Sequence, residues 1–564
     1  MTGPRVFLLT AMIVAAASNP PAAAAPPTPG GPSAGITADI RVGFGGYVVP
    51  DAWIPVTLRL RSEREVAGTV EVTASRARPP GTERVRVEVH LVPRTPHPLT
   101  VPVIVRDLRS PLVVRFLEQG GVAATWPVSI PAGRLVDGVV LAVSRRPVGL
   151  QQILGESGRI RVAYVTADDL PARWQLYEGV AAVVVRDLDD RRLIPAQVEA
   201  LAGWVATGGR LIIAAPRSEI LSRPALQPFI VPPPLPPPFP GAPEEVHPWG
   251  RGRVTVIPVD PFRADLPPDD AAMWTRLLGE PRTPPFVDRT LLDVLPQNPG
   301  TSLSLQVVIL LTLGLYLILL RPLTRGLLRG RSGWALAAAL LVGATAVTAT
   351  LNLAVRRGAS TIVQGVVAVA LPDQGVALVE SVGRVFLSRG GAFQLRAGAE
   401  TLVRPLAGAE TTLVLNQVVR FEGRAEATLP VRAATLVPLP IHGLYREGPE
   451  GVEVQIENRS GRRLRDPIVF LDGRIQPLPP LDRESRATLS PLRWREPAAV
   501  DAVRGPENRL LAWAFGRLRG DAILSPTVSL VAWLDDDRGI LHWPGQPAAP
   551  LLLVLPLSRP EGAP

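Results

Sequence analysis

Three aspartates, Asp187, Asp189 and Asp190, follow an apolar run in the sequence. The run, GVAAVVV at 179–185, has the continuous apolar character of a strand buried on both faces of a parallel sheet. Ligands of open parallel sheets bind beyond the carboxyl ends of the strands, where carboxylates can hold a cation or a polar group. The sequence therefore predicts a ligand site at these aspartates. The alternative is a solvated loop that caps the next helix.

A serine and a histidine offer a second possible chemistry. Ser218 lies in LIIAAPRSEI at 211–220, and His247 is the nearest candidate base. A serine nucleophile needs a base within hydrogen-bond reach and an acid that orients the base, and no G-x-S-x-G elbow surrounds this serine. We expect Ser218 to cap the helix that follows. The sequence predicts no catalytic residue; an envelope hydrolase that uses Ser218 or the acidic loop is the alternative.

Metal and cofactor sites have little support in the sequence. The chain contains no cysteine, and its five histidines never fall within metal-ligand spacing of one another. The acidic triplet at 535–537 lacks the later glutamate of a calcium loop. We therefore predict neither a metal site nor a cofactor.

Five apolar runs predict the strands of one parallel sheet. They are GVVLAVS at 138–144, RIRVAYV at 159–165, GVAAVVV at 179–185, RLIIAA at 210–215 and RVTVIPV at 253–259. Helical segments separate them, most clearly at 194–206, where Pro195 lies in the first turn and Gly208 follows the end. The sequence predicts a doubly wound α/β domain at 136–285.

Alternating strands flank this domain on both sides. In WIPVTLRLR at 53–61, apolar and polar residues alternate as in a half-buried strand, which predicts a β-sandwich at 36–135. GVEVQIEN at 451–458 has the same period, and RSGRR at 459–463 predicts a hairpin turn into the next strand. We expect one or two β-sandwich units at 358–564.

Three further segments predict export and membrane anchoring. Residues 1–25 have the form of a secretory signal peptide. Apolar runs within 301–322 and 334–355 are each long enough to cross a bilayer. The connection at 321–333 carries arginines and no acid, so the positive-inside rule places it in the cytoplasm. The sequence predicts a bacterial inner-membrane protein with two transmembrane helices and extracytoplasmic main domains.

The stretch GVAAVVVRDLDDRRLIPAQVEALAGWVATGGRLIIAA, followed by WGRGRVTVIPVDP, resembles the class I glutamine amidotransferase-like domain of uncharacterised exported membrane proteins of bacteria. The resemblance extends more loosely to GYVVPDAWIPVTLRL before it and IENRSGRRLRDPIVFLDG after it. Such a domain implies a cysteine nucleophile at a strand-to-helix turn. Here Ala215 and Pro216 occupy that turn, so the resemblance implies a fold and no catalytic residue.

The charge pattern bears on possible partners. The net charge is +10, but the arginines are scattered rather than gathered in a stripe with aromatic residues, which argues against a nucleic-acid partner. We expect the lipid bilayer and other envelope proteins as partners, and the oligomeric state stays open. The leading hypothesis is a non-catalytic binding or scaffold component of the cell envelope. The alternatives are the hydrolase and an accessory subunit of a transport or secretion complex.

Overall fold

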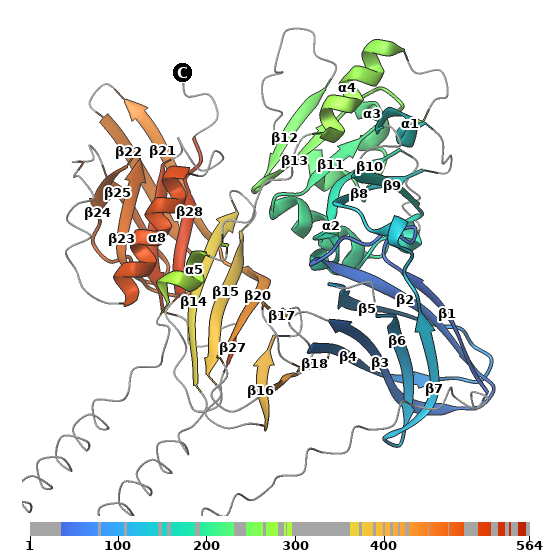
Figure 1. Ribbon diagram of the computed structural model, residues 1–564. Helices are drawn as coiled ribbons and strands as arrows, with labels where there is room; N and C mark the ends of the chain where they lie inside the picture. The colour runs from blue at the N-terminus through green and yellow to red at the C-terminus, as the bar shows by residue number, and fades with distance from the viewer. Residues whose placement is uncertain are drawn as a thin grey trace, which may run out of the picture.

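The structure, a computed structural model, describes residues 35–295 and 361–559, with gaps inside both ranges. The described strands form five sheets, of three, six, eight, eight and three strands (Figure 1). In Figure 1 the N-terminal unit lies at the lower right, the sheet of β8 to β13 and its helices lie above that unit, and the C-terminal region lies on the left. The fold class is therefore dominated by strands, which far outnumber helices among the described residues.

The N-terminal unit consists of strands whose sequence alternation matches their burial. In β2, Val56, Leu58 and Leu60 are fully buried, whereas Arg59 and Arg61 are exposed. Strands β1, β2 and β5 form a three-stranded sheet, while β3, β4, β6 and β7 belong to a larger one. The strands are β1 Ile36–Val42, β2 Trp53–Ser62, β3 Val66–Arg76, β4 Gly81–Leu91, β5 His97–Ile104, β6 Leu112–Glu118 and β7 Gly121–Val128.

The larger sheet is completed by strands from the C-terminal region. β4 pairs in parallel with β18, Glu410–Val414, so that Thr412 lies beside Arg84. β18 is followed by β19 Val418–Gly423, β16 Gly391–Ala397 and β27 Leu541–His542, in the order β27-β16-β19-β18-β4-β3-β6-β7. Phe421 of β19 is buried in the same core as Phe116 of β6. The N-terminal unit and the C-terminal region thus share one sheet and one core.

The five predicted apolar runs do form strands of a common sheet. Its order is β12-β13-β11-β10-β8-β9, with β12 antiparallel at one edge and the other strands parallel. The strands are β8 Gly138–Val143, β9 Ile160–Val165, β10 Val180–Val185, β11 Arg210–Ile213, β12 Glu245–Trp249 and β13 Gly252–Val256. The helices are α1 Leu150–Leu154, α2 Pro195–Ala206, α3 Arg217–Leu221 and α4 Pro268–Gly279, with short 3-10 helices η1 Ala132–Arg134, η2 Ala167–Asp169, η3 Trp174–Tyr177 and η4 Gln227–Ile230.

The predicted fold class, a doubly wound amidotransferase-like α/β domain and a transmembrane hairpin between two β-sandwiches, is wrong. Among the described helices of the six-stranded unit, only α2 and α4 are longer than five residues. The connection from β9 to β10 forms η2 and η3 rather than a crossover α-helix, and Pro171 between them interrupts helical hydrogen bonding. Outside this unit, the described chain is built mainly from β-sheets, one of which contains strands of both the N- and C-terminal parts.

The C-terminal region has three layers. A second eight-stranded sheet, in the order β17-β20-β15-β14-β28-β26-β23-β24, packs on one face against the sheet β21-β22-β25. Helices α5 and α8 cover its other face, where Phe515 stacks on Phe470 with ring centroids 5.3 Å apart. The elements are β14 Thr361–Leu371, β15 Val376–Phe386, β17 Leu402–Pro405, β20 Thr428–Pro438, β21 Ile441–Gly448, β22 Gly451–Asn458, β23 Leu464–Leu471, β24 Arg474–Pro477, β25 Ser485–Leu489, β26 Ser529–Leu534, β28 Leu551–Pro556, α5 Thr290–Val294 and α8 Pro506–Gly520.

The predicted localisation in the inner membrane is also corrected. In the part of the chain that the structure describes, no helix has both the length and the apolar character needed to cross a bilayer. The segments predicted to span the membrane, 301–322 and 334–355, and the predicted signal peptide at 1–25 lie outside the described residues.

Candidate functional site

The ligand site predicted at the acidic loop falls on residues outside the part of the chain that the structure describes. Asp187, Asp189 and Asp190 lie outside the described residues, although β10 ends just before them at Val185. The ligand site at these aspartates therefore stays a prediction. Charged side chains that the structure does describe surround the end of β10.

Those groups form a network of ion pairs. Arg186, directly after β10, places Nη1 3.2 Å from Oε1 of Glu219 and Nε 3.4 Å from Oδ2 of Asp260. Arg223, one turn after Glu219, pairs with the same carboxylate. Among the described residues at this edge of the sheet, these opposite charges are thus paired with one another, as in a structural ion-pair network.

Ser218 and His247 do not form a catalytic pair in the described hydrogen-bond network. Ser218 is exposed in the second position of α3, and Pro216 occupies the N-cap, so the expectation that Ser218 caps the helix is wrong. His247 is fully buried on β12, with Nε2 3.6 Å from Oε2 of Glu245. Within the described residues, no three His, Asp or Glu side chains gather closely enough to hold a metal ion.

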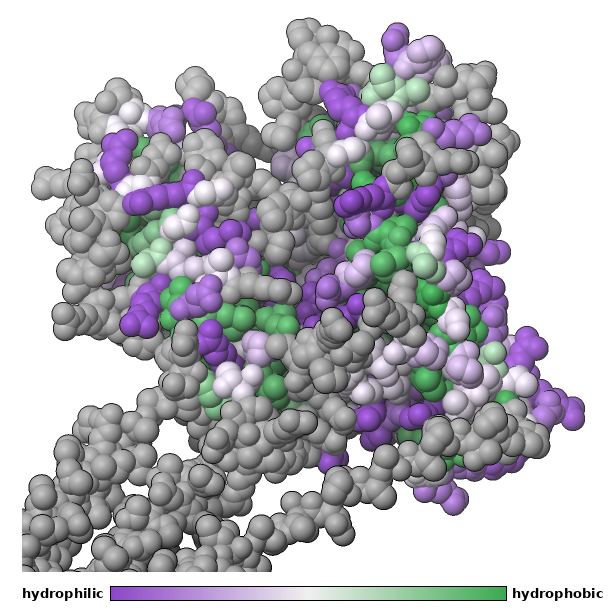
Figure 2. All heavy atoms as spheres, in the orientation of Figure 1, coloured by the Kyte–Doolittle hydropathy of each residue, from purple (hydrophilic) through white to green (hydrophobic). Residues whose placement is uncertain are grey.

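Exposed apolar side chains also fail to mark a site. The face in Figure 2 is a mosaic of hydrophilic and hydrophobic residues. The large apolar side chains that are exposed belong to separate segments of the described chain: Val92, Val122, Leu135, Ile194, Leu221 and Leu444. Isolated exposed residues of this kind are ordinary on protein surfaces.

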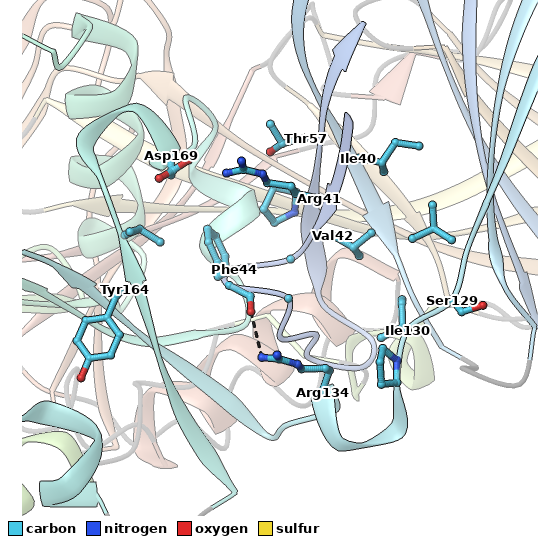
Figure 3. A pocket seen from close by; sticks show the side chains of 17 residues that line it. Ile40, Arg41, Val42, Phe44, Thr57, Ser129, Ile130, Arg134, Tyr164 and Asp169 are labelled. Atoms are coloured by element: carbon cyan, nitrogen blue, oxygen red, sulfur yellow. Dashed lines mark hydrogen bonds between the residues drawn. The ribbon is translucent and has the colours of Figure 1, made fainter. Parts of the chain in front are cut away.

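A cleft of about 430 Å³ lies where the N-terminal unit meets the edge of the six-stranded sheet (Figure 3). One wall is the end of β1 and the loop after it, and the other is the end of β9 with η2. The connection from β7 to η1 lines the cleft as well. The volume falls within the range of small-molecule sites. None of the five histidines lines it.

Residues Gly43–Gly46, which we call the glycine loop, form part of the first wall. Phe44 and Tyr47 exchange two main-chain hydrogen bonds of 3.2 and 2.9 Å, and both residues between them have positive φ angles, 58° at Gly45 and 83° at Gly46. This is the geometry of a tight two-residue turn that favours glycine. The loop is anchored because Phe44 is buried in the core of the six-stranded sheet, 6.4 Å from the ring of Tyr177.

Arg134 lines the cleft with a guanidinium that is held in place by two contacts. Its guanidinium lies 4.9 Å from the centre of the Tyr47 ring, and Nη1 donates a 3.2 Å hydrogen bond to the carbonyl of Gly45. Its main chain is held as well, because its carbonyl accepts from the N–H of Val48 at 2.9 Å. Figure 3 shows the side chain reaching from η1 toward the glycine loop. A cation–π contact and a hydrogen bond together orient this guanidinium.

Two further charged residues line the cleft. Arg41, exposed on β1, is directed in Figure 3 toward the side that carries Asp169. The Asp169 carboxylate already accepts from the main-chain N–H of Thr166 at 3.1 Å and from its hydroxyl at 2.7 Å. With Arg134, the lining therefore carries two cations and one engaged anion.

Tyr164 lines the cleft, but its hydroxyl is hydrogen-bonded outside it. Its hydroxyl accepts a 3.3 Å hydrogen bond from the N–H of Gln151, and its ring packs edge-on against Phe262. Burial raises the pKa of this hydroxyl, because water no longer stabilises the phenolate. Figure 3 shows the side chain turned away from Arg41 and Asp169. It is thus not placed to serve as an acid or base within the cleft.

A comparison with protein families bears on the N-terminal part of the chain. A family described as a domain of unknown function (DUF8726) matches residues 35–130. This range is the N-terminal unit, from just before β1 to just after β7, and it supplies the glycine loop and Arg41. No curated protein matches the chain. The comparisons give no support for the amidotransferase-like resemblance.

The sequence did not single out the residues of the cleft. Arg41, Arg134 and Asp169 lie on three separate elements, and nothing in their local spacing indicates that they meet. The one available signal was GFGGY at 43–47, since adjacent glycines mark a position with unusual main-chain geometry. Glycines of this kind are as typical of a plain turn as of a ligand loop.

Proposed function

We propose that this protein acts by binding a small ligand, without catalysis, and that the cleft between the N-terminal unit and the six-stranded sheet is its binding site. The observation that carries the proposal is the shape of the cleft together with the polar groups on its walls. It is concave and built jointly by two units, with oriented polar groups on its walls. These are the usual features of a small-molecule site.

A binding role fits this lining better than hydrolysis does. The side-chain hydroxyls on the lining are those of Thr57, Ser129 and Tyr164, and no histidine stands near to activate them. The carboxylate of Asp169 is engaged by Thr166. Nucleophilic catalysis needs a nucleophile in contact with a base, and the lining does not supply that pair.

Filling the cleft tests this proposal. Ser129 is an exposed residue of the lining, so Ser129→Trp adds bulk there without disturbing a core. Thr125→Trp, at an exposed position of β7 outside the lining, is the matched control. In native mass spectrometry with a panel of anionic, neutral and cationic metabolites, the wild type and Thr125→Trp should retain a ligand that Ser129→Trp loses. Equal retention by all three proteins, or no retained ligand in any, would contradict the proposal.

A further inference from the structure

The charged groups of the cleft also indicate a ligand class, on the assumption that the cleft is the binding site proposed above. We infer that the ligand carries an oxyanion, a carboxylate or a phosphate, that is bound by the guanidinium of Arg134 with support from Arg41. Two of the three charged side chains of the lining are cations, and the third, the exposed carboxylate of Asp169, already accepts two hydrogen bonds from Thr166 through Oδ2.

Arg134 has the properties of an anion-binding residue. Its Tyr47 contact and its bond to the Gly45 carbonyl use one face and one N–H of the guanidinium. In the described part of the chain, its remaining N–H groups donate no hydrogen bond. A guanidinium presents its donors as a planar fork that matches the two oxygens of a carboxylate or phosphate. Because the side chain is already oriented, less conformational entropy is lost when the anion binds.

The glycine loop adds main-chain donors to the same place. Gly45 and Gly46 line the cleft at the tip of the turn that Arg134 contacts, and their N–H groups donate to no acceptor among the described residues. Adjacent main-chain N–H groups in turns with positive φ are common elements of anion sites. The Gly45 carbonyl does not favour an anion, because its oxygen would repel a negative charge directly in front of it. This oxygen accepts the hydrogen bond from Arg134.

Arg41 is the weaker of the two cations. It lies on β1 with its nearest acid, Asp39, 3.8 Å away, and both side chains are more than half exposed. Its guanidinium lies over no aromatic ring and donates to no carbonyl among the described residues. It therefore contributes long-range attraction to an anion and less to its orientation.

The test compares anionic and neutral probes by isothermal titration calorimetry on the full chain. The probes are citrate for carboxylates, pyrophosphate for phosphates, and glucose as a neutral molecule, all at constant ionic strength. At least one anion should bind the wild type. Arg134→Gln should weaken that binding by about tenfold or more, the loss expected for one charge-assisted hydrogen bond. Arg41→Gln should weaken it less.

Arg61→Gln is the matched control, because Arg61 is an exposed arginine on β2 opposite Thr37, at the far end of the strand pair from the cleft. Equal weakening by Arg61→Gln, or no binding of either anion, would overturn the inference. If glucose bound and Ser129→Trp abolished that binding while neither anion bound, the oxyanion inference would fail and the binding function of the cleft would stand. Arg134→Lys, which keeps the charge but not the fork, should fall between wild type and Arg134→Gln.

Discussion

Arg404 of β17 and Glu178, the residue after η3, form an ion pair through two parallel hydrogen bonds of 2.9 Å each. The same carboxylate accepts from the main-chain N–H of Trp53 at 3.0 Å, and Arg404 also donates to the carbonyl of Asp51. The pair therefore joins the N-terminal unit, the six-stranded sheet and the C-terminal region at one point. Its arginine side chain is only 13% exposed, so water screens the pair weakly.

Breaking this junction should lower stability. Arg404→Met removes the guanidinium that pairs with the Glu178 carboxylate and donates to the Asp51 carbonyl, and we expect the free energy of unfolding in urea to fall by about 2 kcal/mol. Arg159→Met removes an ion pair with Asp137 in which both side chains are mostly exposed, and should cost less than about 0.5 kcal/mol. Equal effects of the two substitutions would show that the Arg404–Glu178 pair stabilises the protein no more than an exposed ion pair does.

The shared core predicts a long-range effect of a C-terminal substitution on the N-terminal unit. Phe421 is fully buried in the core that also contains side chains of β3, β4 and β6, so Phe421→Ala should cost about 3–5 kcal/mol. Hydrogen exchange of the main-chain amides of β3 and β4 should accelerate. Phe470→Ala, in the core beneath α8, should leave β3 and β4 protected. Unchanged protection in Phe421→Ala would mean that the two parts fold independently.

Tyr177 predicts a pH dependence of stability. It is fully buried, its hydroxyl donates to the carbonyl of Pro171 at 3.2 Å, and burial raises its pKa well above the usual value. In the unfolded chain the phenol ionises near pH 10, whereas in the folded protein it stays neutral. Its stabilising contribution is therefore complete below pH 10 and is lost above it.

We expect this group alone to reduce the free energy of unfolding by about 1.4 kcal/mol per pH unit above pH 10. Tyr177→Phe should remove that part of the slope, while costing about 1 kcal/mol at neutral pH for the lost hydrogen bond. Urea unfolding between pH 8 and 11 measures both quantities. Parallel pH curves for the two proteins would contradict the burial of Tyr177.

Two glycines should respond in opposite ways to alanine. A Cβ on Gly252 would lie 2.1 Å from the carbonyl oxygen of Val205 and 2.2 Å from that of Gly209, so Gly252→Ala must displace main chain where β13 meets the end of α2. We expect a loss of about 3 kcal/mol. Gly516 lies within α8 with nothing within 4 Å of its Cβ position, so Gly516→Ala should stabilise the protein by about 0.5–1 kcal/mol. Thermal unfolding of both variants checks the signs.

The sequence by itself determined the elements that depend on neighbouring residues. Alternation in 53–61 predicts β2, the apolar runs predict the parallel strands, and Pro195 with Gly208 brackets α2. These signals are local, because burial on one face repeats at the period of the element that carries it.

Strand partners were decided only in the tertiary structure. The turn at 459–463 exists, held by the Asn458 side chain, whose amide donates to the carbonyl of Arg462 at 2.7 Å. It is not the predicted hairpin, because β22 pairs with β21 and β25 while β23 pairs with β24 and β26 in another sheet. The partnership of β4 with β18 and the cleft around Arg134 arise in the same way. Both depend on contacts between residues far apart in the chain, and a strand's own pattern specifies which face is buried but not which strand lies beside it.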